Sequence, residues 1–154
     1  MGSIVPTPFR GADLAPKIEL IAYSFLRQTR RPLIQKSDDV VAALWMAPCA
    51  VIAQDAGPQA SCFFANRCAL EVLESDHDSL TDAQGEAARQ ATFDLNGLFA
   101  NADAAGKVRN YSGNLTSSRG NRYRVQQALT WPIIDDAGAT HGRAAMFDLW
   151  IALD

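Results

Sequence analysis

The chain has 154 residues, 48% of them hydrophobic and 20% charged, as in an ordinary soluble globular domain with a sizeable core. Its net charge is −3 and we see no basic stripe, so we expect no nucleic-acid partner. No apolar run approaches the length that spans a membrane, and no signal peptide is apparent. The three cysteines lack disulfide or metal-site spacing, which favours reduced thiols in a cytoplasmic protein.

The N-terminal part predicts two helices. Residues 1–12 contain two prolines and two glycines and are expected to form a flexible lead-in. Asp13 is a candidate N-cap for the first helix, which ends before Pro32 because proline cannot continue it. A second short helix is expected from Ser37 to just before Pro48. The first helix carries an apolar stripe at helical spacing: Leu14, Ile18, Ile21 and Phe25.

The middle of the chain predicts a hairpin followed by two helices. Cys49–Gln54 and Ser61–Ala65 are short apolar runs separated by turn residues, as in a β-hairpin. Asn66 is a good N-cap for the next helix. The capping-box pattern that begins at Thr81 predicts the longest helix, which runs to about Asn101. A strand is then expected over Val108–Ser117.

The C-terminal part predicts two long strands joined by a turn. The first alternates from Arg122 to Ile134, with these residues on one face: Tyr123, Val125, Gln127, Leu129, Trp131 and Ile133. The second places these on one side: Ala145, Phe147, Leu149, Ile151 and Leu153. Strands segregated from helices in this way predict an α+β domain with helices on one face of an antiparallel sheet.

Several short segments match one known pattern in the same order: Phe63 to Glu71, Tyr111-Ser112-Gly113, Gly120 to Val125, Ala128 to Asp135, and Gly142 to Phe147 with Trp150. They resemble the "YAN..AL", "YSG…S..G.RF.I", "A.VWNL.D" and "GQAA.F..W" segments of the MEKHLA family, a PAS-like domain. The resemblance spans roughly Leu20–Trp150. The "PSR.SAEP" stretch that the family usually carries before its long helix is absent here.

This resemblance implies a PAS-like α+β fold, with a five-stranded antiparallel sheet, helices packed on one face and an added N-terminal helix. The first strand should then pair with the last. Residues 13–154 would form a single PAS-like domain whose N-terminal helices lie within 13–47. By analogy with PAS domains, the resemblance also implies a sensory or regulatory role.

The cleft between sheet and helices is the expected ligand site, and the sequence leaves any cofactor unknown. Gln127 draws notice because its amide falls on an otherwise apolar face, where it meets either a buried partner or a ligand. The expected ligand-binding residues are Phe64, Asn66, Leu98, Tyr111, Tyr123, Gln127 and Trp131.

Other reactive residues fit plain structural roles better. Asn66-Arg67-Cys68 superficially resembles the Asn-Cys-Arg of flavin-binding photosensory PAS domains, but the order differs, so a buried thiol is favoured at Cys68. His77 lies among acidic residues, which favours an exposed loop over haem ligation. Asp135 and Asp136 fit a turn better than a catalytic carboxylate pair. No nucleophile–base spacing is legible.

Three functions stay open from the sequence. The leading hypothesis is a PAS-like sensory module that binds a small molecule and acts through protein association. The alternatives are a pure interaction module without a ligand and a small cleft enzyme. The apolar stripe of the first helix also predicts a homodimer, because the sheet's outer face looks too small and mixed to cover it.

Overall fold

A computed structural model describes residues 5, 9, 11–34, 38–55, 62–74, 109–117 and 119–153. Its elements are α1 (Ala15–Thr29), α2 (Val40–Met46), β1 (Ala50–Asp55), β2 (Cys62–Ala65), α3 (Arg67–Leu73), β3 (Arg109–Thr116), β4 (Arg122–Ile134), β5 (Thr140–Phe147) and β6 (Leu149–Leu153). The long helix expected from Thr81 to about Asn101, like the expected cap Ser37, lies outside the described residues.

The strands form one antiparallel sheet in the order β2-β1-β5-β4-β3, with β6 also paired to β4. β5 and β6 together are the expected last strand, interrupted at Asp148. The first strand lies beside the last, with Ala50 opposite Phe147 and Asp55 opposite Gly142. This pairing joins segments far apart in sequence and confirms the predicted PAS-like sheet.

A bulge in β4 changes which side chains share a face. Gln127 has a φ of 57°, and two β4 residues between Val125 and Ala128 face a single β3 residue. One extra residue reverses the alternation of a strand. Val125 and Ala128 therefore lie on one face and Trp131 on the other, so the expected common face from Tyr123 to Ile133 is wrong.

The interruption at Asp148 has the same effect on the last strand. Phe147 is fully buried, whereas Leu149 and Ile151 are 48% and 54% exposed. The predicted common side from Ala145 to Leu153 is therefore wrong as well. Trp150, rather than its neighbours, packs toward the core, where its ring meets Phe147 at a centroid distance of 5.8 Å.

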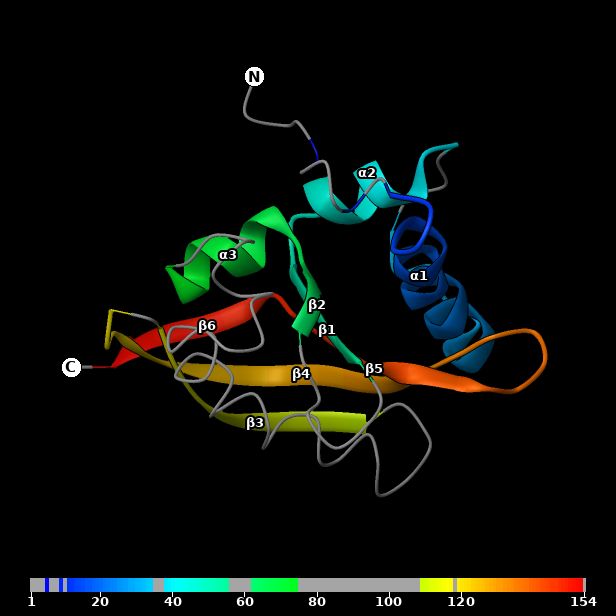
Figure 1. Cartoon of the computed structure of the whole chain (residues 1–154). Coiled ribbons are helices and arrows are strands. Elements are labelled where there is room, and N and C mark those ends of the chain that lie inside the picture. The colour runs from blue at the N-terminus through cyan, green and yellow to red at the C-terminus, as the bar shows by residue number, and fades with distance from the viewer. Residues whose placement is uncertain are drawn as a thin grey trace.

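α3 packs on one face of the sheet and α1 and α2 pack on the other. β1 and β2 lie between α3 and α1 (Figure 1). We call the face toward α3 the inner face and the opposite one the outer face. The buried inner cluster consists of Ala50, Ile52, Ala65, Ala69, Val72, Leu73, Val125, Ala128, Ala145 and Phe147. The outer cluster joins α1 and α2 to residues such as Val51, Phe64, Trp131, Ile133 and Ala144.

α1 forms because its apolar residues recur at helical spacing and pack on the outer face of the sheet. Ile18 and Ile21 are fully buried there, and Phe25 is 5% exposed. The helix begins after Leu14 rather than with a side-chain cap from Asp13, and it ends at Arg30 in the left-handed conformation. The stripe that predicted a homodimer is therefore covered within the chain, and that argument for a dimer is wrong.

The N-terminal lead-in also reaches this core. Phe9 is 1% exposed and Val5 is 6% exposed. The Phe9 ring lies 5.0 Å from the ring of Phe64 and 6.1 Å from that of Trp45, measured between centroids. At these two positions the expected flexible lead-in is packed, because its apolar side chains find other aromatic rings.

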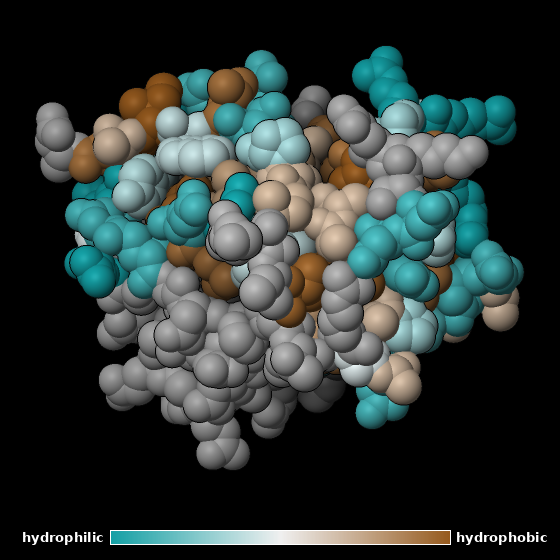
Figure 2. Space-filling view, turned by 90° about the horizontal axis from the view of Figure 1, so that it is seen from above, coloured by the Kyte–Doolittle hydropathy of each residue, from teal (hydrophilic) through white to brown (hydrophobic). Residues whose placement is uncertain are grey.

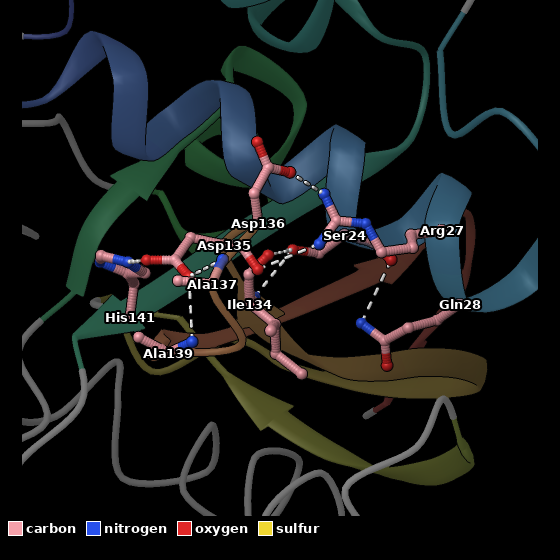
Figure 3. A network of polar contacts seen from close by, with 9 residues as sticks. All are labelled: Ser24, Arg27, Gln28, Ile134, Asp135, Asp136, Ala137, Ala139 and His141. Atoms are coloured by element: carbon pink, nitrogen blue, oxygen red, sulfur yellow. Dashed lines mark hydrogen bonds and ion pairs between the residues drawn. The ribbon is translucent and has the colours of Figure 1, made fainter.

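Polar contacts fix the C-terminal half of α1 to the hairpin of β4 and β5 (Figure 3). The Ser24 hydroxyl donates to the carbonyl oxygen of Ile134 at 2.9 Å and accepts from its N–H at 2.8 Å. Arg27 Nη2 donates to Asp136 Oδ1 at 2.6 Å, and Gln28 Nε2 donates to the carbonyl of Pro132 at 2.9 Å. These bonds satisfy backbone groups at the strand end and hold the helix in register on the sheet.

The hairpin turn is organised by Asp135. Its Oδ1 accepts from the N–H groups of Ala137 and Ala139, each at 2.9 Å, and its Oδ2 lies 2.7 Å from Nε2 of His141. The bond to His141 is the main cause of the lowered pKa of Asp135, followed by the Ala139 N–H. The prediction that Asp135 serves the turn agrees with this geometry.

Candidate functional site

The inner face of the sheet carries a polar group of residues on three neighbouring strands. Gln54 of β1 lies opposite Arg143 of β5, while Ile52 and Thr130 lie opposite Ala145 on either side. Residues directly opposite in antiparallel strands project to the same face. We call this set the inner platform: Ile52, Gln54, Ala128, Thr130, Arg143 and Ala145.

Two of the platform's polar side chains are buried without a partner. Gln54 is 1% exposed and Thr130 is fully buried. Among the described residues, the amide oxygen and nitrogen of Gln54 and the hydroxyl of Thr130 are buried without a hydrogen-bond partner. Buried polar groups are nearly always paired, so three such atoms on one face make the platform a candidate binding site. On the outer face, Nε1 of Trp45 is likewise buried without a partner.

The side chains at the centre of the platform are small. Ala128 and Ala145 are fully buried and add only a methyl group above the sheet. Ala145 lies between Ile52 and Thr130 across the strands. Because β5 separates β1 from β4, the backbones of β1 and β4 are about 9.5 Å apart, from two strand spacings. Gln54 and Thr130 lie diagonally across β5, since Gln54 is in line with Arg143 and Pro132. The platform therefore has small apolar side chains at its centre and polar side chains on β1, β4 and β5.

Arg143 supplies the platform's one ionisable group. It is half-buried on β5, directly between Gln54 and Pro132 in the register. Beyond the platform, no three His, Cys, Asp or Glu side chains in the described residues gather as around a metal ion. The chemistry of the platform is therefore hydrogen bonding beside one positive charge.

The expected site residues are not brought together. Phe64 and Trp131 lie in the outer cluster, on the side of the sheet away from the platform. Trp131 is fully buried, as predicted, but its Nε1 donates to the carbonyl of Ile21 at 3.1 Å and its ring meets Phe25 at 4.8 Å. Both aromatic side chains thus serve the packing of α1, α2 and the sheet.

Asn66 has a structural role that uses its whole amide. Its Oδ1 accepts from the N–H groups of Val51 and Ala69, each at 3.0 Å. Its Nδ2 donates to the carbonyl oxygens of Leu44 at 3.0 Å and Cys49 at 2.8 Å. The predicted N-cap is confirmed, and the same side chain ties α3 to β1 and to the end of α2.

The other expected contacts are dispersed. Gln127 is exposed at the β4 bulge, so it does not share a face with Trp131. Tyr123 is half-buried and packs on the inner cluster. Tyr111 belongs to β3, opposite Ala128, and Leu98 lies outside the described residues.

The platform residues are hard to find in the sequence for identifiable reasons. Unbroken alternation places Thr130 on the face opposite Val125, and only the bulge brings both onto the inner face. Gln54 ends the apolar run Cys49–Gln54, where a glutamine is a recognisable signal. No feature of the sequence separates Arg143 from the other arginines.

The two described free thiols are poor nucleophiles. Burial, and secondarily the neighbouring Cys68, raises the pKa of Cys49 to about 11. The pKa of Cys68 is also raised, chiefly by burial and then by Glu71. Cys68 Sγ lies 3.7 Å from the carbonyl oxygen of Pro48. Both thiols stay protonated at neutral pH, as expected of structural cysteines.

Part of the outer face beyond α1 and α2 is open. Leu149 and Ile151 project there from β6, opposite Gln126 and Arg124 of β4. We call Arg122, Arg124, Leu149 and Ile151 the open outer patch. Elsewhere hydrophobic side chains reach the surface in small groups between hydrophilic ones, as in the view of Figure 2. A patch of neighbouring large apolar side chains is a candidate interaction surface.

Solved structures with a similar fold include light-oxygen-voltage domains. A variant of Vivid matches with a TM-score of 0.55 and 12% identity, covering 84% of this chain and 97% of that one. A fungal LOV domain photoreceptor matches with a TM-score of 0.54 and 14% identity, covering 85% and 89%. An RNA-binding light-oxygen-voltage receptor matches with a TM-score of 0.54 and 14% identity, covering 71% of this chain and 31% of that one. At such identities the likeness shows the fold, which is that of a PAS-type domain.

The family follows from the sequence itself. The model of the MEKHLA domain matches residues 16–152, so the chain belongs to the MEKHLA family. No curated protein matches the chain. Of the helices in the described part of the chain, none has the length and apolar character needed to cross a membrane.

Proposed function

We propose that this protein is a cytoplasmic PAS-like sensory module that binds a small molecule on the inner platform and acts through protein association. The observation that carries the proposal is the burial of Gln54 and Thr130 without hydrogen-bond partners. The family and the PAS-type fold support a sensory role by analogy.

The energetics favour a bound molecule over an empty platform. A buried polar group without a partner costs about 1–3 kcal/mol, and the platform holds three such atoms. A ligand that pairs with Gln54 and Thr130 offsets this cost, while its apolar surface covers Ala128 and Ala145. Binding then stabilises the fold by an amount that grows with ligand concentration.

Replacing Gln54 with leucine separates a ligand site from a plain packing position. If the amide serves a ligand, Gln54→Leu should keep or raise the stability of the ligand-free protein, because an unpartnered polar group is removed. The same change should abolish the stabilisation that the co-purified molecule gives. Gln126→Leu, on the same sheet but on the outer face, is the matched control. Thermal unfolding before and after removal of small molecules measures both effects.

A pure interaction module is the second candidate, and the open outer patch favours it. If Gln54→Leu lowers stability and no small molecule is ever bound, the platform is packing and the interaction module is the better account. A small cleft enzyme finds less support, because Arg143 is the one ionisable residue of the platform and general acid–base catalysis needs a group that titrates near the working pH.

We propose that the association is a homodimer formed through the open outer patch. Leu149 and Ile151 are about half exposed on a flat sheet surface, where a second copy can bury them. Soluble oligomers are most often two-fold symmetric dimers, in which one patch meets itself. This places the interface on β4 and β6 rather than on the covered stripe of α1.

A further inference from the structure

The side of α1 that points away from the sheet forms a second candidate interaction surface, distinct from the inner platform and the open outer patch. We infer that it docks a basic amphipathic helix of a partner protein, which rests on the proposed role in protein association. The residues that carry the inference lie along α1 and in the turn between β4 and β5, and we call them the α1 groove: Glu19, Leu20, Tyr23, Leu26, Arg27 and Asp136.

α1 is apolar on two opposite sides. The side toward the sheet is fully buried at Ile18 and Ile21. On the other side, apolar residues recur every third position: Leu20 is half-buried, and Tyr23 and Leu26 are each 46% exposed. A surface helix ordinarily carries polar side chains there. Neighbouring apolar side chains in such a place indicate a surface that another protein covers.

The hairpin turn walls this side of the helix and makes it concave. Asp136 lines the groove together with the α1 residues, and the groove has a volume of about 560 Å³. Arg27 fixes the wall, because its Nη2 donates to Asp136 Oδ1 at 2.6 Å and its Nη1 to the carbonyl of Asp135 at 3.1 Å (Figure 3). From Glu19 to Arg27 the groove is about 12 Å long, or two helical turns. This length suits a partner helix that docks residues at i, i+3 or i+4, and i+7.

The charges of the groove set the chemistry of the partner. Its ionisable groups at neutral pH are Glu19, Arg27 and Asp136. Arg27 and Asp136 neutralise each other in an ion pair. Glu19 is half-buried and, among the described residues, has neither a hydrogen bond nor an ion pair. The unmatched charge is therefore negative, and a lysine or arginine beside an apolar anchor complements it.

A second copy of the chain complements the groove less well. If two α1 helices met antiparallel about Tyr23, Glu19 of each copy would lie level with Arg27 of the other, four residues from the centre on either side. Both Nη atoms of Arg27 already donate within the chain, so Glu19 would gain little. Two grooves with the same unmatched negative charge also repel each other. These charges favour a basic partner.

Three synthetic helical peptides with the same apolar face test the inference on the full chain. Lysine, glutamine or glutamate flanks that face, and fluorescence anisotropy at low salt measures binding. We expect the lysine peptide to bind wild type about fivefold or more tightly than the glutamate peptide, because attraction to Glu19 replaces repulsion. Glu19→Gln should reduce this preference to about twofold or less. Glu71→Gln removes the same charge from an exposed position on α3 and should keep the preference in full.

A double variant shows where the peptide binds. Tyr23→Ser combined with Leu26→Ser changes two exposed side chains, so it should stay folded and lose binding of the lysine peptide. Binding that this variant retains, or wild type that binds no peptide, would rule out the α1 groove as a docking site. A tighter glutamate peptide, or an equal loss of preference in Glu19→Gln and Glu71→Gln, would contradict the basic partner.

The remaining outcomes separate this inference from the proposed function. If wild type self-associates and the double variant at Tyr23 and Leu26 is monomeric, a second copy occupies the groove and the inference is wrong. If no peptide binds although the purified protein carries a small molecule or dimerises through the open outer patch, the inference fails and the proposed function stands.

Discussion

Trp131 is the residue on which the packing of α1 depends most directly. Its ring is fully buried, it meets Phe25 nearly edge-on, and its Nε1 is bonded to the carbonyl of Ile21. We expect Trp131→Ala to lower the free energy of unfolding by about 3–5 kcal/mol, the usual cost of truncating a buried aromatic. Urea denaturation measures this loss. A change below about 1 kcal/mol would mean that α1 does not rest on this ring.

Asp135 makes the stability of the hairpin depend on pH. Its pKa is lowered in the folded state, first by the bond to His141 and then by the Ala139 N–H. The carboxylate therefore stabilises the fold above the unfolded pKa of about 3.9, and this contribution is lost as the pH falls through the lowered folded pKa. We expect Asp135→Asn to lower the melting temperature at pH 7, with the difference from wild type shrinking below about pH 4.

Melting curves between pH 7 and pH 2.5 test this dependence. Asp148→Asn, at an exposed position without a resolved hydrogen-bond network in the described chain, is the control. A difference between wild type and Asp135→Asn that stays constant across the range would rule out the proposed role of the ionised carboxylate.

Asn66 shows what residue types predict and what they leave open. An asparagine before an apolar helical run predicts an N-cap, because its side chain accepts from the first turn. The bonds to Leu44 and Cys49 could not be predicted, since they depend on where α2 ends relative to α3. The local sequence pattern therefore predicts the cap, whereas only the tertiary structure shows that the whole Asn66 amide is bonded within the fold.

The β4 bulge decides which β4 residues lie on the inner platform. Gln127 adopts a φ of 57°, which β-branched residues rarely adopt. We expect Gln127→Val to lower stability by about 1–3 kcal/mol, the usual range for a strained backbone position, and Gln127→Gly to be tolerated. Gln126→Val, in the preceding residue, should have little effect because valine suits a strand. Equal effects at the two positions in chemical denaturation would contradict the bulge.

The strand over Arg122–Ile134 could be predicted because its alternation is long and strong. The bulge that interrupts this alternation at Gln127 could not be predicted. A bulge leaves the residue types unchanged and shifts only their direction, so unbroken alternation wrongly places Gln127 on the face of Val125 and Thr130 on the opposite one. The pairing of β1 with β5 came from the family resemblance, since local periodicity says nothing about partners distant in sequence. The inner platform depends on both features, and this is why the fold could be predicted and the platform could not.

At the scale of the whole molecule, the open outer patch predicts how two copies meet. We expect Leu149→Glu combined with Ile151→Glu to convert a dimer to monomers, because two charges would then be buried in the interface. Met46→Glu, at an exposed apolar residue outside the patch, should leave the dimer intact. Sedimentation at micromolar concentration distinguishes these states. A wild-type protein that is monomeric throughout would overturn the dimer.

The central claim is that the inner platform holds a small molecule through Gln54. Native mass spectrometry of freshly purified protein tests it most directly, because bound mass and oligomeric state are read together. We predict that wild type and Gln126→Leu carry one additional small-molecule mass per chain, and that Gln54→Leu is folded but carries none. Wild-type protein without any bound mass, or a bound mass retained in full by Gln54→Leu, would contradict the account.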